Sequence, residues 1–216
     1  MDALWDNRQL VLEGFGQTLA LLVVAGFIAL ALGTVLGSFR VSPVLALRAI
    51  GTAYVTCFRN TPLVVLFLLV YFGLPELDVR PSQFWRATIA LALYTTAFIC
   101  EAVRSGINAV PTGQAEAARS VGMGFGQVLR LVVLPQAFRA VVPPIASVLI
   151  ALAKNTSLVA GFGIADATFR MRGLINDNPG DVYVIFLGIA LGYILIVAVI
   201  SVVARVLERS PARSAS

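Results

Sequence analysis

The sequence predicts an all-α integral membrane protein whose chain crosses the bilayer five times. Hydrophobic residues make up 59% of the 216 residues and charged residues only 12%, whereas soluble domains carry about 25% charged residues. Apolar stretches also recur at lengths that suit helices crossing a hydrocarbon core of ~30 Å. We therefore expect a single transmembrane domain over residues 1–209, followed by a short polar cytoplasmic tail over residues 210–216.

The first and last predicted spans contain no charged residue. They are Gly14–Phe39 and Val182–Ala204, and each is long enough to cross the bilayer as a helix. Each also contains two glycines four residues apart, which let two helix backbones approach closely. We expect these pairs to serve packing within the chain first and contact between subunits second. The pairs are Gly33 with Gly37 and Gly188 with Gly192.

The three middle spans carry ionisable residues at or near membrane depth. A charge on a lipid-facing surface costs at least ~2.5–3.5 kcal/mol at the helix centre. We therefore expect these three helices to form an inner ring, while the first and last helices face lipid. The three spans are Ala49–Pro75 with Arg59, Ala87–Cys100 continuing into Glu101 and Arg104, and Ala140–Ala165 with Lys154, the only lysine.

The placement of charge predicts the orientation of the chain. Five spans put the termini on opposite sides, and an outside N-terminus places nine arginines in cytoplasmic segments and five outside. This excess favours an outside N-terminus and a cytoplasmic C-terminus, because basic residues gather in cytoplasmic loops. The net charge of +5 comes from scattered arginines, so no nucleic-acid partner is expected.

The composition also limits the chemistry of the chain. It contains no histidine, which removes imidazole acid–base chemistry and the commonest metal ligand. We therefore expect neither catalytic residues nor a metal site. Cys57 and Cys100 lie inside apolar segments, and both are expected to be small buried packing residues. The outside loop Asp166–Asp181 is expected to hold a short interfacial helix.

The polar stretch Gly113–Gly122 lies between two apolar segments and is cytoplasmic in this orientation. Pro111 precedes it, Thr112 is expected to cap its first turn, and Gly122 is expected to end it in a left-handed conformation. Small residues leave one side of the helix nearly smooth, and an acid and a base lie three positions apart. From spacing alone an ordinary connecting helix is the simpler interpretation, and a helix that docks another protein is the alternative. The side chains concerned are Ala115, Glu116, Ala117, Ala118 and Arg119.

This loop resembles the EAA loop of permease subunits in ABC-type importers. Glu116-Ala117-Ala118 is followed by Gly122, Val132 and Leu134-Pro135 at the spacing of that loop, with Val132 where the family usually has Ile. Longer stretches resemble the polar amino acid branch of the family, and their sequences most resemble actinobacterial-type glutamate permeases. These stretches are Phe58–Pro75, Glu101–Gly122, Leu134–Arg139 and Leu149–Leu158; the branch often has Gln, Asn and Glu where Leu66, Ser147 and Asp166 stand.

The resemblance implies a type I ABC importer permease fold in a bacterial cell membrane, with a cytoplasmic EAA loop at about residues 107–135. It implies three partners: an ATP-binding cassette ATPase dimer, a second permease subunit in a homo- or heterodimer, and an extracytoplasmic amino-acid-binding protein. ATP and Mg²⁺ would be used by the ATPase, so no cofactor is expected in this chain, which lacks the Gly-Lys-Ser/Thr of a Walker A loop. The residues implied in docking the ATPase are Glu116, Ala117, Ala118, Arg119, Gly122, Leu134 and Pro135.

Polar residues within the middle spans are candidates for a translocation path or for ties within the inner ring. Lys154 either holds the ring together or meets a substrate carboxylate, and Arg59 is a second cation suited to the path. Glu101 and Arg104 form either a local salt bridge or a latch toward the docking helix. The full set is Arg59, Asn60, Thr61, Glu101, Arg104, Lys154, Asn155 and Thr156.

The predicted function is the permease subunit of an ATP-driven, binding-protein-dependent importer for glutamate or another polar amino acid. The alternative is an ATP-independent channel or secondary carrier for small polar solutes, which has no use for a cytoplasmic docking helix. An intramembrane enzyme is disfavoured, because the sequence has no histidine and no Gly-x-Ser-x-Gly motif.

Overall fold

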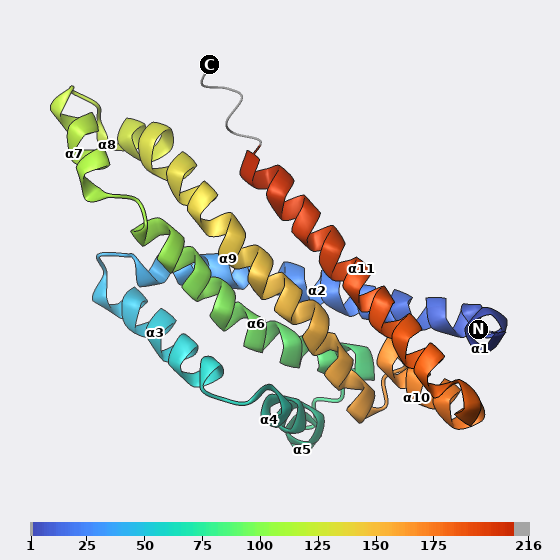
Figure 1. Cartoon of the computed structure of the whole chain (residues 1–216). Coiled ribbons are helices and arrows are strands. Elements are labelled where there is room, and N and C mark those ends of the chain that lie inside the picture. Colours follow the sequence, from blue (N-terminus) through green and yellow to red (C-terminus); the bar gives the residue numbers. More distant parts are fainter. Residues whose placement is uncertain (1, 210–216) are drawn as a thin grey trace.

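The computed structural model describes residues 2–209, and every element in that range is a helix (Figure 1). The predicted all-α fold is therefore confirmed, while the predicted tail over residues 210–216 lies outside the described residues. Four segments are long and apolar enough to cross a membrane. They are α2 (Arg8–Arg40), α6 (Gln83–Asn108), the continuous run Phe125–Phe162, and Pro179–Glu208, which contains most of α11 (Val182–Arg209).

The predicted span Ala49–Pro75, second in chain order, is not one straight helix. It consists of α3 (Leu45–Arg59) and a second helical run, Leu63–Glu76, which meet at an angle of 99°. Pro62 explains the break, because proline disfavours helical geometry at the preceding residue and cannot donate a backbone hydrogen bond. The predicted span Ala49–Pro75 is thus wrong as a single rod, although the pair counts as a fifth span if both halves lie in the membrane. The second run comprises α4 (Leu63–Leu68), the π-helical turn η1 (Leu69–Gly73) and α5 (Leu74–Glu76).

The helices around the docking loop extend further than their apolar runs. The run Phe125–Phe162 begins before the predicted Ala140 and contains α8 (Phe125–Gln127), η2 (Val128–Val133), α9 (Leu134–Asn155) and η3 (Thr156–Phe162). The short helix expected in the outside loop is α10 (Ala167–Asp177). The remaining elements are α1 (Asp2–Asp6), α7 (Thr112–Ser120) and η4 (Pro179–Asp181).

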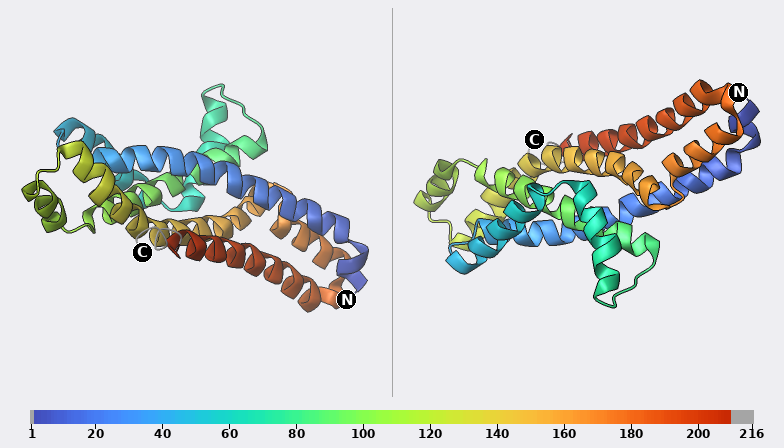
Figure 2. Two further views of the ribbon diagram at one scale, coloured as in Figure 1. Left: turned by 90° about the horizontal axis from the view of Figure 1, so that it is seen from above. Right: turned by 90° about the horizontal axis from the view of Figure 1, so that it is seen from below.

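Helix α6 forms the centre of the chain. The most apolar stretch of 18 residues in α6 is 67% buried, whereas the corresponding stretches are 33% buried in α2 and 11% buried in the last span. The expected inner ring is therefore only partly right: α6 is central and α11 is peripheral, but α2 packs along α6 while α3 lies at the edge (Figures 1 and 2). A charged residue indicates that its face of the helix avoids lipid, but it does not indicate which neighbouring helix covers that face.

Glycines allow the closest helix contacts. A Cβ built on Gly33 would lie 2.6 Å from the Ile99 side chain, and one on Gly37 would lie 2.8 Å from Val103. On α11, Gly192 faces the Phe15 ring. Both predicted glycine pairs therefore serve packing within the chain, Gly188 doing so against Leu4.

The two ends of the bundle differ in what they carry. α7 and α8 lie at one end, together with the start of α9 and the C-terminal end of α11 (Figure 1). The N-terminus, α1 and α10 lie at the other end. α4 and α5 project sideways from the bundle (Figure 2). Within the described residues, the predicted docking helix α7 and the end of α11 thus lie opposite α1.

Candidate functional site

Helix α7 is a short helix with a well-defined C-terminal stop. Gly122 has φ +88°, as predicted, and its backbone N–H donates to Arg119 O at 3.0 Å. The N–H of Met123 donates to Ala118 O at 3.2 Å. These two bonds form a Schellman motif, which satisfies carbonyls that the helix end leaves free.

The predicted cap at the other end of α7 is wrong. Thr112 is the first residue of the helix, and Pro111 occupies the cap position in an extended conformation without a side-chain hydrogen bond. Proline suits this place because its fixed φ is compatible with the turn, while its missing N–H is not needed there. The helix start is therefore defined by the geometry of Pro111 and by its carbonyl, which accepts from the Gln114 N–H at 3.0 Å.

The faces of α7 divide the predicted docking residues into two groups. Ala118 is buried, and α7 packs against η2. Glu116, Ala117 and Arg119 are exposed, as are Leu134 and Pro135 at the start of α9. Ala118 therefore packs α7 against its own chain, while Glu116, Ala117 and Arg119 remain available to another protein.

A surface cavity of about 720 Å³ lies beside η2 and was missed by sequence reasoning. Its lining combines two glycines with the polar side chains of Gln127 and Arg130, and the Gly124 N–H donates to Gln127 Oε1 at 3.0 Å. Three glycines within Gly122–Gln127 are the signal that could have indicated it, since glycine lets the backbone turn closely. The lining residues are Gly124, Gly126, Gln127, Arg130 and Leu131.

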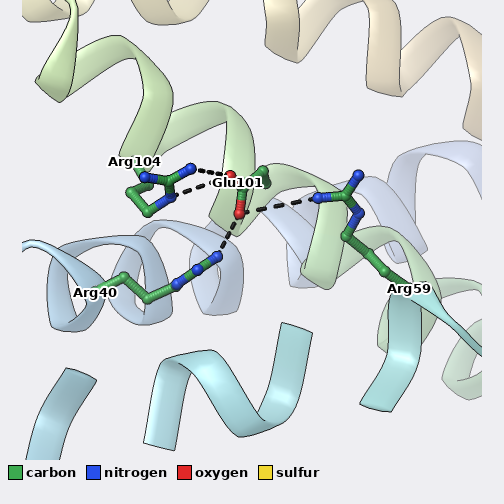
Figure 3. Close-up of polar contacts among 4 residues, drawn as sticks. All are labelled: Arg40, Arg59, Glu101 and Arg104. Atoms are coloured by element: carbon green, nitrogen blue, oxygen red, sulfur yellow. Dashed lines mark hydrogen bonds and ion pairs between the residues drawn. The ribbon is translucent and has the colours of Figure 1, made fainter. Parts of the chain in front are cut away.

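Glu101 lies at the centre of a cluster of three arginines from three helices (Figure 3). Arg104, one turn further along α6, donates to Oε1 through its Nε at 3.0 Å and also through a terminal nitrogen. Arg40 of α2 bonds Oε2. Arg59 of α3 approaches the same oxygen at 4.0 Å. The predicted local pair of Glu101 and Arg104 is therefore confirmed, but it is part of a larger cluster that joins α2, α3 and α6.

The cluster borders a cavity of about 460 Å³. Arg59 and Asn60 both line it, so the structure brings two of the predicted path residues together with Glu101. Thr61 instead donates its hydroxyl to Cys57 O at 2.8 Å and serves the end of α3. The cavity is lined by Arg40, Val55, Thr56, Arg59, Asn60, Phe98 and Glu101.

Three candidate path residues lie where α9 ends and η3 begins, and their side chains have different surroundings. Lys154 is exposed on this chain. Asn155 is half-buried and lines a second cavity of about 370 Å³. Thr156 is fully buried and donates to Ala153 O at 2.7 Å, so it supports the helix end and does not line the cavity. The second cavity is lined by Tyr94, Thr95, Phe98, Ser147, Val148, Ala151, Leu152 and Asn155.

Asp166 is a buried carboxylate that sequence reasoning did not select. It caps α10 by accepting from the Phe169 N–H at 2.8 Å, and it accepts from the Tyr193 hydroxyl of α11 at 3.2 Å. The next residue, Ala167, donates its N–H to the hydroxyl oxygen of Thr18 in α2 at 3.2 Å. Burial raises the pKa of Asp166 above its ordinary value of 3.8. An aspartate just before a helix was the available signal, because aspartate is a favoured N-cap.

The two cysteines have different environments. Cys100 is buried as expected, whereas Cys57 is exposed on α3. The expectation for Cys57 is wrong because α3 lies at the edge of the chain. Within residues 2–209, no three residues of the types His, Cys, Asp and Glu are grouped so as to hold a metal ion.

Comparison with known proteins decides the family. Residues 16–213 match the family described as binding-protein-dependent transport system inner membrane component. The chain belongs to this family. The permease is 40% identical to the glutamate transport system permease protein GluC of Corynebacterium efficiens, over 91% of the chain and 92% of the relative. It is 35% identical to the glutamate/aspartate import permease protein GltJ of Escherichia coli, over 91% of the chain and 85% of the relative.

Solved structures agree on the architecture. The permease matches a chain of an amino acid ABC transporter crystallised with histidines, with a TM-score of 0.85, 29% identity and coverage of 96% of both chains. It matches a chain of the MetNI methionine ABC transporter with a TM-score of 0.73 at 22% identity, covering 95% of the permease and 97% of that chain. The second likeness is one of fold alone. The expected type I ABC importer permease fold is thus confirmed.

Proposed function

We propose that the permease is the membrane subunit of an ATP-driven importer that carries glutamate or a closely similar polar amino acid into the cell. The observation that carries the proposal is α7, a helix outside the spans that keeps Glu116, Ala117 and Arg119 exposed. A channel or carrier would gain nothing from such a helix. The choice of substrate rests on the relatives from Corynebacterium and Escherichia, whose names specify glutamate or glutamate and aspartate.

The proposed assembly contains three kinds of protein. Two permease subunits, identical or different, form the membrane path, and a dimer of ATP-binding subunits docks on α7 and on the start of α9. An extracytoplasmic binding protein delivers the amino acid at the end that carries α1 and α10. ATP and Mg²⁺ act in the ATP-binding subunits. The N-terminus is outside and the C-terminus is cytoplasmic, which follows from the greater number of arginines in the segments that the sequence predicts to be cytoplasmic.

The proposed path runs along the surface that exposes Lys154 and Arg59. Each is the sole charged residue within its predicted apolar span, and Asn155 and Asn60 lie beside them on cavities. Glutamate carries two carboxylates and one ammonium group, so a cation and neighbouring amide groups along the path offset its excess negative charge. Thr61 and Thr156 are outside this role, since both hydroxyls bond their own helix ends.

Reconstitution tests the proposal directly. The permease, its ATP-binding subunit and its binding protein are placed in proteoliposomes, and uptake of radiolabelled L-glutamate is measured with and without ATP inside the vesicles. We expect uptake that requires both ATP and the binding protein. Equal uptake without ATP would favour the channel or carrier, and ATP-dependent uptake of other amino acids with no uptake of glutamate would leave the importer but overturn its substrate.

A further inference from the structure

The cluster around Glu101 contains more positive charge than it neutralises. Arg40, Arg59 and Arg104 contribute three positive charges, and each forms its ion pair with the single carboxylate of Glu101, which leaves a net charge of +2. None of the four side chains is more than 43% exposed. Partly buried charge of one sign is costly unless an opposite charge accompanies it. The cluster is therefore incomplete as an internal salt bridge.

Arg59 is the member with unused hydrogen-bonding capacity. Arg40 and Arg104 each hydrogen-bond one oxygen of Glu101, whereas Arg59 lies 4.0 Å from the nearer oxygen, at the limit of an ion pair. Its guanidinium group lies over the Phe98 ring, 5.4 Å from the ring centre. A guanidinium has five N–H donors in a planar fork, which matches a carboxylate or phosphate group. The aromatic ring orients this fork without occupying its donors.

The space in front of Arg59 has the size and chemistry of a small-anion site. The cavity of about 460 Å³ falls within the range of ligand pockets. Asn60 adds an amide and Thr56 a hydroxyl to the two arginines on its wall, Arg40 and Arg59. Four donor-bearing side chains therefore surround a space in which Glu101 is the one acidic lining residue.

Arg40 reaches this cavity through an opening made by a glycine. A Cβ built on Gly51 of α3 would lie 2.6 Å from Arg40 Cγ and 3.0 Å from Leu36 O. Any larger residue at position 51 would push the Arg40 side chain aside. The second cation of the cavity wall therefore depends on the absence of a side chain on the neighbouring helix.

We propose that the cavity between Arg40 and Arg59 is an anion site that binds one carboxylate or phosphate group. The bound group accepts two hydrogen bonds from the Arg59 guanidinium and offsets the positive charge that the Glu101 carboxylate does not neutralise. The ligand is either a free acidic amino acid or the headgroup of an anionic lipid, since both present the same chemistry. The site lies on the proposed path beside Arg59 and Asn60, so this inference rests on the proposed function, and binding to the site needs no ATP.

Opposite effects of two neutral substitutions test the site. The purified complex of permease and ATP-binding subunit, without binding protein, is placed in nanodiscs of phosphatidylcholine, and equilibrium binding of radiolabelled L-glutamate and its displacement by inorganic phosphate are measured. Arg59→Gln is expected to weaken binding about tenfold, because one charged hydrogen-bond partner is lost. Glu101→Gln is expected to strengthen it, because the competing carboxylate is gone. Arg59→Lys should retain part of the affinity, and Arg205→Gln, an exposed arginine at the far end of α11, should change nothing.

A second arm identifies a lipid ligand. Nanodiscs containing phosphatidylglycerol are analysed by native mass spectrometry for retained lipid in the same variants. Loss of retained phosphatidylglycerol in Arg59→Gln and gain in Glu101→Gln would support the site with a headgroup as its ligand. The proposal is overturned if neither glutamate, phosphate nor phosphatidylglycerol binds in an Arg59-dependent way, or if Glu101→Gln weakens binding as much as Arg59→Gln. ATP-dependent uptake by the wild-type protein is measured separately, so loss of the site and loss of the import function are distinguishable.

Discussion

Gly106 of α6 lies directly against Val141 of α9. A Cβ built on Gly106 would be 2.1 Å from Val141 Cγ2 and 3.0 Å from its Cα and N atoms. Two of those three atoms belong to the backbone, so a rotamer change cannot make room. The spans before and after α7 in the sequence are therefore in close contact at this point, only two residues before α6 ends.

Gly106→Ala is expected to force α6 and α9 apart and to lower the melting temperature of the purified permease by several degrees, since overpacking commonly costs about 1–3 kcal/mol. Gly16→Ala is the matched control. Gly16 also lies within a helix but has nothing within 4 Å of its built Cβ, so alanine should be neutral or slightly stabilising there. Equal melting temperatures for Gly106→Ala and the wild type would contradict the close packing of the two helices.

Gly122→Val tests the stop of the docking helix. Valine at φ +88° is strained by about 1–3 kcal/mol, so the Schellman closure of α7 should open while the spans stay intact. We expect normal insertion into the membrane but weaker co-purification of the ATP-binding subunit, and Glu116→Ala should act in the same direction. Gly180→Val is the control, because Gly180 has no positive φ and no neighbour within 4 Å. Wild-type co-purification and coupling in both α7 variants would remove the docking role of this helix.

Asp166 should make the stability of the permease depend on pH. Burial raises the pKa of Asp166 above 3.8, so the folded protein binds more protons than the unfolded chain between these two pKa values. Stability is therefore greatest below 3.8 on this account and falls as the pH rises through the folded-state pKa. Asp166→Asn keeps an acceptor for the α10 cap but does not titrate.

The measurement is the melting temperature of wild type and Asp166→Asn over a pH series that starts near 3.8. The difference between them isolates Asp166 from other titrating groups, and we expect the variant to gain relative to wild type as the pH rises. Asp166→Ala removes the cap and one of the two partners of the Tyr193 hydroxyl, and should cost about 1–2 kcal/mol at the low end of the series and less as the pH rises. A constant difference between wild type and Asp166→Asn would show that burial does not perturb this carboxyl.

Exchanging the charges of Glu101 and Arg104 should not restore transport. In a two-residue salt bridge, the double variant Glu101→Arg with Arg104→Glu would recover the attraction that each single variant loses. Here an arginine at position 101 would face Arg40 and Arg59, which now point at the carboxylate. We expect the double variant to stay at the level of the single ones in ATP-dependent uptake. Full recovery would show that the pair acts alone and that the wider cluster has no part in transport.

Lys154→Met tests charge on the proposed path. Methionine keeps the length of the side chain and removes its charge, and Lys154 is exposed on this chain, so assembly should be near normal. We expect sharply reduced glutamate uptake in proteoliposomes, with Lys154→Arg retaining part of it. Normal uptake by a fully assembled Lys154→Met complex would leave the residue without a role in the path.

Features set by local chemistry could be predicted from the sequence. The uncharged runs located α2 and α11, and Gly122 indicated its own left-handed conformation, because a helix stop depends on adjacent residues. The docking role of residues on α7 is a prediction that comes from the resemblance to the EAA loop. Spacing alone favoured an ordinary connecting helix, since nothing within ten residues says which face of α7 another protein would use.

Features set by tertiary contacts could not be predicted. Arg40 joins Glu101 across 61 residues of sequence, and only the crossing of α2 with α6 brings them together. Asp166 looked like an ordinary loop acid, whereas in the structure Tyr193 of α11 donates to it and Thr18 of α2 accepts from the neighbouring Ala167 N–H. The break near Pro62 was visible as a proline, but the apolar residues on both sides made the segment read as one span.

The 99° angle between α3 and the run Leu63–Glu76 has a consequence for lipid contact. The last four carbonyls of a helix lack partners within it. At the end of α3, the Thr61 hydroxyl donates to the Cys57 carbonyl. Hydrocarbon offers no hydrogen bond to the others, so irregular backbone at membrane depth exists only against protein or water. If both halves of the broken span lie in the membrane, acyl chains cannot cover the junction at residues 60–62, and that flank must be hydrated or sealed by protein.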